Sequence, residues 1–309
     1  MIILKSPVWS DYELLDSGNG QRLERFGQYI LTRPDPQIIW QPHLSKSEWE
    51  KADAVFDGNW KIKTEMPDKW VIKYRNINLY CKLSPFKHTG VFPEQAANWD
   101  WIRDVILGTQ SEAWRTPESK KDPGQARMTK TQPNILNLFG YTGIASLVAA
   151  ANGAKVTHID ASYPTIGWAR ENQTASGLDE KPIRWILDDA LKFVEREIKR
   201  GVKYDGILMD PPVYGHGPKG EVWDFNKSFP VLMEACMKIL SDKPLFILVN
   251  AYAISTSSLT LENVLADFTK SLGGKVESGE LVLQEKSSER LLSTGIFARW
   301  SKDEAKLAI

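Results

Sequence analysis

The amino-acid sequence predicts a doubly wound, mostly parallel α/β sheet that follows a smaller antiparallel β module. Beyond residue 133, short apolar strands alternate with helices, the pattern of a parallel sheet covered on both faces. Up to about residue 85, extended stretches are instead separated by turn residues such as SGNG. We therefore expect an N-terminal β-rich module over residues 1–85 and a sheet domain over residues 86–309.

Composition excludes several classes of protein. The 39 basic and 39 acidic residues cancel, so the net charge gives no argument for a large nucleic-acid footprint. The only cysteines, Cys81 and Cys236, form no CxxC motif, which disfavours a disulfide framework and a structural metal site. Asp11 and Glu13 interrupt the start before an apolar core develops, and no apolar run reaches the roughly 18 to 20 residues that span a bilayer. We expect a soluble, cytoplasmic protein without a metal.

The elements before the sheet are read from turns and helical spacing. Residues 70–83 alternate in polarity around an Arg-Asn turn, which predicts a strand pair. Residues 92–107 place Pro93 near a first turn and apolar residues at helical spacing, which predicts a helix. Residues 109–133 contain three prolines and no apolar periodicity, so we expect a surface loop.

The sheet elements then follow in regular order, and most of the helices end at glycine. The last two segments are expected to pair as an antiparallel hairpin at the sheet edge. Strands are expected at 134–139, 155–160, 183–189, 204–210 and 244–252, helices at 144–153, 164–177, 190–201, 229–242 and 260–274, and the hairpin at 277–286 and 293–300.

A glycine turn follows the first strand of this sheet. It reads Gly140, Tyr141, Thr142 and Gly143, which is neither the GxGxxG of a dinucleotide site nor the GxxxxGK[ST] of a nucleotide-triphosphate loop. Asp160 ends the next strand, where a carboxylate can accept hydrogen bonds from both hydroxyls of an adenosine ribose. NAD sites use the same arrangement, so Asp160 alone leaves the cofactor open.

Later strand ends supply further candidate groups. Asp188 and Asp189 follow the third strand, where a carboxylate can accept from an adenine amino group. Asp210, Pro211 and Pro212 end the fourth strand, which we place opposite the glycine turn across the switch point of the sheet. The prolines lack amide hydrogens, so we expect their carbonyls to accept hydrogen bonds from a substrate amine.

Together these residues resemble class I S-adenosylmethionine-dependent methyltransferases, with a doubly wound, Rossmann-like sheet. Within them the chain is most similar to the family of 23S (large-subunit) ribosomal RNA base methyltransferases, and in particular to its short bacterial members of unassigned substrate. The resemblance implies S-adenosylmethionine as cofactor and ribosomal RNA as partner. It is carried by HTGVFPEQAANW (88–99), NLFGYTG (137–143), DAS (160–162) with WARENQ (168–173), DDALKF (188–193) and DPPVYGHGPKGEVWDF (210–225).

The resemblance also implies a role for each motif. Residues 137–143 pass under the methionine part, Asp160 holds the ribose, Asp189 with Ala190 frames the adenine, and residues 90–98 close over the cofactor. In that last segment the family has Asp-Gln-Arg followed by Asn, whereas this chain has no arginine there. The expected cofactor-binding residues are Gly90, Phe92, Gln95, Asn137, Phe139, Gly140, Tyr141, Thr142, Gly143, Asp160, Ala161, Ser162, Asp189, Ala190 and Asp210.

The expected chemistry is direct methyl transfer. C5 methylation of a pyrimidine needs a cysteine thiolate, and no cysteine follows the fourth or fifth strand, while Cys236 lies mid-helix as an expected core residue. Transfer to a nitrogen or oxygen then depends on positioning and electrostatics. The D-P-P turn with an aromatic one position late resembles the signature of amino-group methyltransferases. The expected catalytic residues are Asp210, Pro211, Pro212 and Tyr214.

Several alternatives stay open at this point. The acceptor can be a small molecule or a protein side chain, the chain can be a silent cofactor-binding scaffold, and a NAD-dependent oxidoreductase is the remaining enzyme class. Asp160 can serve as a helix cap, and Asp188 can cap the helix that follows it. His216 and Lys219 are either substrate contacts or solvated loop residues. The target base and the oligomeric state are not determined.

Overall fold

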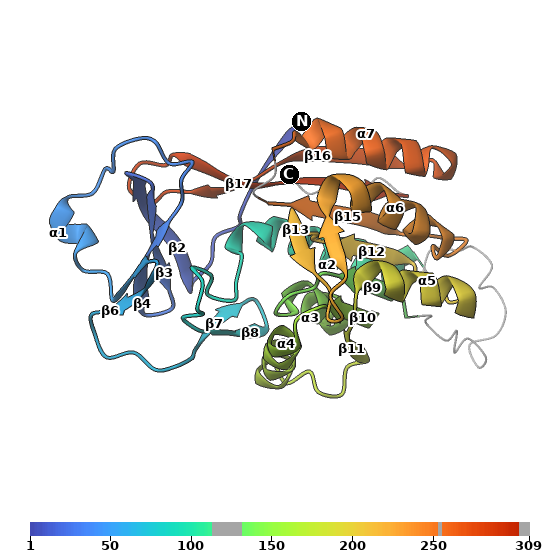
Figure 1. Ribbon diagram of the computed structural model, residues 1–309, viewed down its shortest axis with the longest axis horizontal. Helices are drawn as coiled ribbons and strands as arrows, with labels where there is room; N and C mark the ends of the chain where they lie inside the picture. Colours follow the sequence, from blue (N-terminus) through green and yellow to red (C-terminus); the bar gives the residue numbers. More distant parts are fainter. Residues whose placement is uncertain (113–131, 253–254, 303–309) are drawn as a thin grey trace.

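The main feature of the structure, a computed structural model that describes residues 1–112, 132–252 and 255–302, is a twisted eight-stranded sheet (Figure 1). Its strand order is β1-β16-β17-β15-β12-β9-β10-β11. The five strands from β15 to β11 run parallel, and β17 is antiparallel to both of its neighbours. The strands are β1 (Ile2–Lys5), β9 (Asn134–Leu138), β10 (Lys155–Asp160), β11 (Ile183–Leu187), β12 (Gly206–Met209), β15 (Phe246–Ala251), β16 (Lys275–Gln284) and β17 (Leu291–Ser301).

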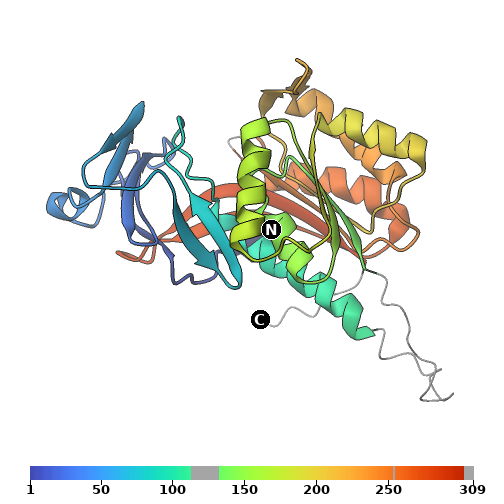
Figure 2. The same cartoon turned by 90° about the horizontal axis from the view of Figure 1, so that it is seen from below.

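Helices cover both faces of this sheet (Figure 2). Along β9, Leu136 and Leu138 pack into a core with α5, α6 and α7, whereas Ile135 packs into a core with α2 and α3. Successive residues of a strand point to opposite faces, so a strand buried on both sides is apolar at most positions. This confirms the predicted doubly wound fold. The helices are α2 (Ala96–Glu112), α3 (Ile144–Ala151), α4 (Tyr163–Ala175), α5 (Ala190–Arg200), α6 (Phe225–Lys238) and α7 (Ser258–Thr269).

A smaller module lies beside the sheet. It holds a five-stranded sheet of order β2-β3-β4-β5-β6 and a separate β7-β8 hairpin. All of its strand pairs are antiparallel except β4-β5, which is parallel. The elements are β2 (Tyr12–Gly18), β3 (Gln21–Phe26), β4 (Tyr29–Pro34), α1 (Lys46–Trp49), β5 (Ala54–Asp57), β6 (Asn59–Ile62), β7 (Trp70–Tyr74) and β8 (Ile77–Cys81).

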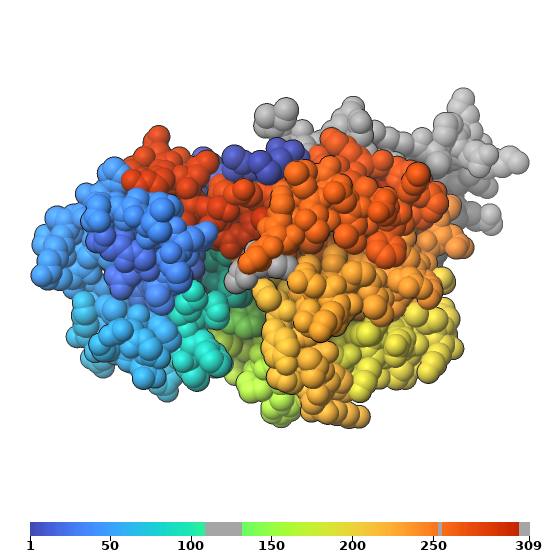
Figure 3. All heavy atoms as spheres, turned by 45° about the horizontal axis from the view of Figure 1, so that its top comes forward, coloured from blue at the N-terminus to red at the C-terminus, as the bar shows by residue number. Residues whose placement is uncertain are grey.

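The β16-β17 hairpin joins the two parts. Beyond the end of β16, Glu285 bridges Leu14 of β2, and its carboxylate accepts a hydrogen bond from Ser17. In the space-filling view the C-terminal strands lie against the N-terminal module (Figure 3). The hairpin is therefore not at the sheet edge as expected, because β1 pairs with the outer side of β16. Strand β1 belongs to the large sheet although it lies within residues 1–85. The division of the chain into two domains at residue 85 stays a prediction.

Some helices begin or end at other residues than expected, because capping hydrogen bonds set their ends. The helix expected at 229–242 begins at Phe225, because the Asp224 carboxylate accepts a hydrogen bond from the amide of Lys227 and so caps α6. A 3-10 turn, η1 (Pro93–Gln95), precedes α2, and a second, η2 (Lys270–Leu272), follows α7. Helix α2 takes in the first residues of the loop expected at 109–133, and residues 113–131 lie outside the described residues.

Two further strands were not expected. β13 (Tyr214–His216) and β14 (Val222–Asp224) form a short antiparallel hairpin after the fourth parallel strand. They lie on either side of the glycine-rich residues 217–220, where no alternation of polarity marks a strand. Among the helices that the structure describes, none is long and apolar enough to cross a membrane.

A buried carboxylate anchors the N-terminal module and gives a stability prediction. Glu24 is fully buried and accepts hydrogen bonds from Arg33 Nε and Nη2, both at 2.7 Å, and from the Tyr12 hydroxyl at 2.8 Å. Glu24→Ala leaves Arg33 buried without its partner, which costs about 3–5 kcal/mol. Glu48→Ala, which removes an exposed pair with Lys51, should cost less than about 1 kcal/mol. Urea unfolding measures both, and equal losses would contradict the assignment.

Candidate active site

The turn after β9 has an unusual backbone. Phe139 has φ 55°, Tyr141 φ 52° and Gly143 φ 84°, so two aromatic residues adopt the left-handed conformation that bulky side chains rarely take. Asp160 holds this turn in place. Its Oδ2 accepts a hydrogen bond from the amide of Tyr141 at 2.9 Å, and its Oδ1 accepts one from the amide of Ser162 at 2.8 Å. Asp160 is not the N-cap of α4, a position that Ser162 occupies.

The glycines of the turn are required by what lies beneath them. A Cβ on Gly140 would come within 2.3 Å of the His158 ring, and one on Gly143 within 2.8 Å of Trp185. His158 is buried, and burial lowers its pKa to about 3, so the ring is neutral and its Nδ1 lies 3.0 Å from the Ser146 hydroxyl. These glycines therefore serve close packing of the turn on the sheet.

The segment expected to close over the cofactor does lie against this turn. The Thr142 hydroxyl donates to the carbonyl of Gly90 at 2.7 Å, and the Phe92 and Tyr141 rings lie 5.4 Å apart. Gly90 has φ 93°, and a Cβ there would come within 2.1 Å of the Trp168 ring. This contact between Gly90 and Trp168 of α4 was not predicted, because no local pattern marks it.

The same segment places Gln95 on the carboxylate that ends β12. Gln95 Nε2 donates to Asp210 Oδ2 at 2.6 Å. Burial raises the pKa of Asp210 to about 7, and the nearby charge of Glu94 adds to the effect. A carboxyl group with a pKa near neutrality can exchange a proton or a hydrogen bond with a reacting group. The roles predicted for Asp210 in catalysis and binding stay predictions.

Three cavities lie around these groups, and Phe139 lines all of them. The largest, which we call the cleft, has a volume of about 660 Å³. Asp160, Ala161, Asp210, Pro211 and Pro212 form one wall of the cleft, and residues of the N-terminal module form the other. A narrow extension of about 40 Å³ is lined by carboxamides, those of Gln95, Asn98, Asn137 and Asn250.

The third cavity, of about 60 Å³, lies at the expected adenine position and is lined by Asp188, Asp189 and Ala190. The expectation that Asp188 caps α5 was wrong. Asp189 is the cap, because it directly precedes Ala190 and its Oδ1 accepts the amide of Lys192 at 2.9 Å. Asp188 instead accepts the amide of Asp189 and pairs with Arg196.

Two expectations concern the loop after β12. One of them, a free Pro212 carbonyl, was wrong, and the other, stacking by Tyr214, is not supported by the cavities. The Pro212 carbonyl is not left free, since it accepts a hydrogen bond from Trp223 Nε1 at 2.6 Å. Tyr214 is 58% exposed and packs edge-on against His216 with ring centroids 5.4 Å apart. Tyr214 lines none of the three cavities, so its stacking on a substrate stays a prediction.

Neither cysteine can serve as a nucleophile in the cleft. Cys81 and Cys236 are free and fully buried, and burial raises the pKa of both thiols. Cys236 is part of the core beneath α6, as predicted. Within the described ranges, no group of three or more His, Cys, Asp or Glu side chains gathers in a way that could hold a metal ion.

Solved structures resemble most of this chain. A crystal structure of a S-adenosylmethionine-dependent methyltransferase from Agrobacterium tumefaciens is 39% identical, with a TM-score of 0.89 over 98% of this chain and 94% of that one. The chain belongs to the S-adenosylmethionine-dependent methyltransferases. SMU.776, a protein assigned as a methyltransferase and solved with SAH, shares the fold at 17% identity, with a TM-score of 0.63 over 91% of this chain and 72% of that one. No family model matches the sequence.

Curated relatives of this methyltransferase are larger. The ribosomal RNA large subunit methyltransferase K/L of Shewanella loihica is 31% identical over 185 residues, which are 56% of this chain and 24% of that protein. The chain therefore spans less than a quarter of the relatives it matches. Family membership confirms the predicted resemblance and the predicted cofactor, while the roles of single residues stay predictions.

The packing under the turn gives a matched pair of variants. Gly140→Ala forces a methyl group against His158 and should displace the turn, lowering affinity for S-adenosylhomocysteine by about tenfold or more. Gly167→Ala, on the exposed side of α4 with nothing within 4 Å, should leave affinity unchanged and stabilise the helix by about 0.5–1 kcal/mol. Calorimetric titration and thermal melts test both, and unchanged affinity in Gly140→Ala would refute the packing argument.

The buried carboxyl of Asp210 gives a pH-dependent prediction. Its raised pKa means that the folded protein keeps a proton which the unfolded chain has lost, so stability falls as pH rises from about 4 to about 7. Asp210→Asn should therefore raise the melting temperature at about pH 8 by several degrees and have little effect at about pH 4. Asp68→Asn, at an exposed position, is the control. A gain that does not depend on pH would argue against a buried charge at Asp210.

Proposed function

We propose that this methyltransferase transfers a methyl group directly to a nitrogen atom of a base in ribosomal RNA. The observation that carries the proposal is the hydrogen bond of 2.6 Å from Gln95 to Asp210, at the strand edge that faces the glycine turn. It fixes a buried carboxylate where the cofactor and acceptor sites meet. The similarity to ribosomal RNA large subunit methyltransferases supports the choice of substrate.

The residues around the turn fit the cofactor. Each Asp160 oxygen accepts one backbone amide and keeps a second lone pair for a ribose hydroxyl. Asp189 and Ala190 line a small cavity suited to an adenine edge, and the carboxamides of the narrow extension suit the charged ends of an amino acid. S-adenosylmethionine supplies a methyl group on a positively charged sulfur. With Asp160 and Asp210 both lining the cleft, its ribose and its sulfur would lie along the same wall.

Asp210 is the residue that would act on the acceptor. In its ionised form it accepts a hydrogen bond from an amino group and so turns the nitrogen lone pair toward the methyl group. Gln95 holds the carboxylate in this orientation. Because both thiols are fully buried, no covalent intermediate through cysteine is available, which favours direct transfer.

A base that is paired and stacked inside an RNA double helix cannot reach a carboxylate that lies in a cleft of the protein. Enzymes that modify bases act on unpaired nucleotides or rotate the target base out of its stack into a pocket. The cleft of about 660 Å³ offers room beside Asp210 for such a base.

A ribosomal RNA substrate also places the protein in the cytoplasm, and the buried, unpaired state of both cysteines fits that compartment.

Cofactor binding and methyl transfer test the proposal in sequence. The protein should bind S-adenosylmethionine and S-adenosylhomocysteine in calorimetry and not NAD, and Asp160→Ala should weaken both by about tenfold or more because it removes ribose contacts and releases the turn. Labelled methyl groups should then transfer to ribosomal RNA from a deletion strain and not to RNA from the parent. Labelling of small molecules alone would overturn the substrate, and absence of cofactor binding would overturn the site.

Asp210→Asn provides the mechanistic test. It should lower kcat by about 10²–10⁴-fold while affinity for S-adenosylhomocysteine changes little. In the wild type, kcat should rise with pH and level off above about 7, because the ionised form of Asp210 is the acceptor of the hydrogen bond. The variant should lack this ionisation, and Asp68→Asn should retain it. A wild-type rate that falls with pH across this range would contradict the role given to Asp210.

A further inference from the structure

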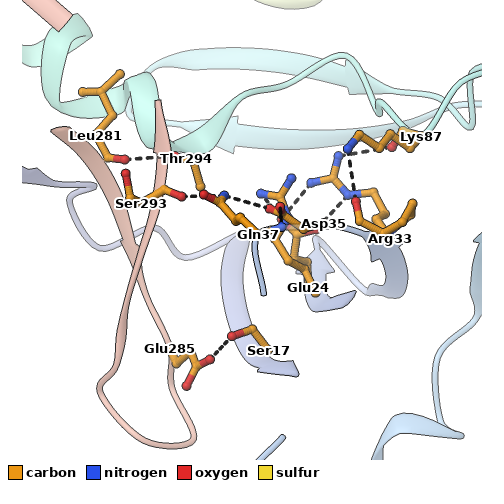
Figure 4. A network of polar contacts seen from close by, with 12 residues as sticks. Ser17, Glu24, Arg33, Asp35, Gln37, Lys87, Leu281, Glu285, Ser293 and Thr294 are labelled. Atoms are coloured by element: carbon orange, nitrogen blue, oxygen red, sulfur yellow. Dashed lines mark hydrogen bonds and ion pairs between the residues drawn. The ribbon is translucent and has the colours of Figure 1, made fainter. Parts of the chain in front are cut away.

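Three cations contribute to the lining of the cleft. Arg22 of β3, Arg33 of β4 and Lys87, which follows β8, all line the same cavity as Asp210, and we call this part of the lining the cationic wall. Arg22 and Arg33 are nine-tenths or more buried. Figure 4 shows Arg33 and Lys87 gathered with Glu24 and Asp35. The cationic wall and the expected acceptor site therefore share one cavity.

The three cations differ in their carboxylate partners. Arg33 donates to both oxygens of Glu24. Arg22 pairs with Glu24 at 3.8 Å, and its Nε lies 3.3 Å from Asp35 Oδ2 without the geometry of a hydrogen bond. Lys87 Nζ donates to the Pro34 carbonyl at 3.1 Å and, within the part of the chain that the structure describes, pairs with no carboxylate.

Two further titratable groups, His88 and Glu94, also line the cleft. Burial, together with the charges of Arg33 and Lys87, lowers the pKa of His88 to about 4, so this ring is neutral at pH 7. Burial raises the pKa of the Glu94 carboxyl, and the charge of Arg22 acts against that rise. Since buried charges are normally paired, Lys87, which donates only to a carbonyl, is the cation available to an entering anion.

The wall is also held rigidly. Gln37 Nε2 donates to the Ser293 carbonyl at 2.7 Å and lies 3.3 Å from Asp35 Oδ2, which ties the loop that carries Asp35 to β17 (Figure 4). Thr294 in turn donates to the Leu281 carbonyl of β16 at 3.0 Å. A cation set held in place before a ligand arrives loses little entropy on binding.

We propose that Arg22 and Lys87, supported by Arg33, bind a phosphate group of the nucleotide whose base is methylated. This inference rests on the proposed function, because it takes the acceptor base to lie beside Asp210. Phosphate is the anion that arginine and lysine side chains together recognise in nucleic acids, and phosphate contacts set the position of a nucleotide rather than its sequence. The N-terminal module then acts as the substrate-positioning wall of the active site.

The test compares nucleosides with nucleoside 5′-monophosphates on protein saturated with S-adenosylhomocysteine. Each of the four common ribonucleosides and its monophosphate is titrated separately, followed by short single-stranded RNA oligonucleotides. The wild type should bind at least one monophosphate about tenfold or more tightly than its nucleoside. Lys87→Gln should remove this difference, whereas Lys61→Gln, at an exposed lysine of the same module, should keep it.

Arg22→Gln should behave as Lys87→Gln does, and thermal melts show whether either variant is folded. An effect confined to oligonucleotides would assign the site to a backbone phosphate rather than to a free mononucleotide. Equal affinities of Lys87→Gln and wild type for the monophosphates and the oligonucleotides would overturn the proposal. Weakened binding of S-adenosylhomocysteine in Lys87→Gln would also overturn it, since the wall would then hold the cofactor. Failure of the proposed function is separate, because it appears as absent methyl transfer to RNA by the wild type.

Discussion

The two hydrogen bonds that Asp160 accepts from the amides of Tyr141 and Ser162 set the shape of the site. They hold a turn in which Phe139 and Tyr141 adopt a left-handed backbone, a conformation that costs about 1–3 kcal/mol for each residue. Phe139 lines all three cavities. The shape of the turn after β9 thus depends on one carboxylate at the end of β10.

Two carboxyl groups near the cleft differ in their environment. Glu24 is fully buried, yet the charges of Arg33 and Arg22 outweigh burial and lower its pKa to about 2. Asp210 is half-buried, accepts a hydrogen bond from the Gln95 amide and lies near Glu94, and burial raises its pKa to about 7. The first carboxyl is a permanent charge that anchors the module, and the second is able to change its protonation near neutral pH. Such a division of roles is typical of enzyme active sites.

The alternation of apolar strands and helices was enough to predict the large sheet, because a strand buried on both faces leaves a continuous apolar run. Asp160 and Asp210 were found because they end parallel strands. The capping role of Asp189 was missed, since Asp188 and Asp189 differ only in the helical geometry that follows. The partner of the Pro212 carbonyl, Trp223, lies in a hairpin with no strand pattern.

Contacts between distant parts of the chain could not be predicted from the sequence. Arg22, Arg33 and Lys87 carry no motif, and only folding brings them to the cavity of Asp210. The same holds for β1, whose residues resemble any short apolar stretch until β16 is in place beside them. Local patterns specify elements, whereas the faces that meet are set by tertiary packing.

The pairing of β1 with β16 has a consequence for how the protein is made. Ile2 lies beside Gly279, so β1 finds its place in the sheet only after β16 has been made. The β16-β17 hairpin also supplies the tether of Gln37 to Ser293. Contacts of such large sequence separation slow folding. The outer edge of the large sheet therefore cannot form before β16 has been made, and a shortened product that lacks the hairpin would also lack the tether of the loop that carries Asp35.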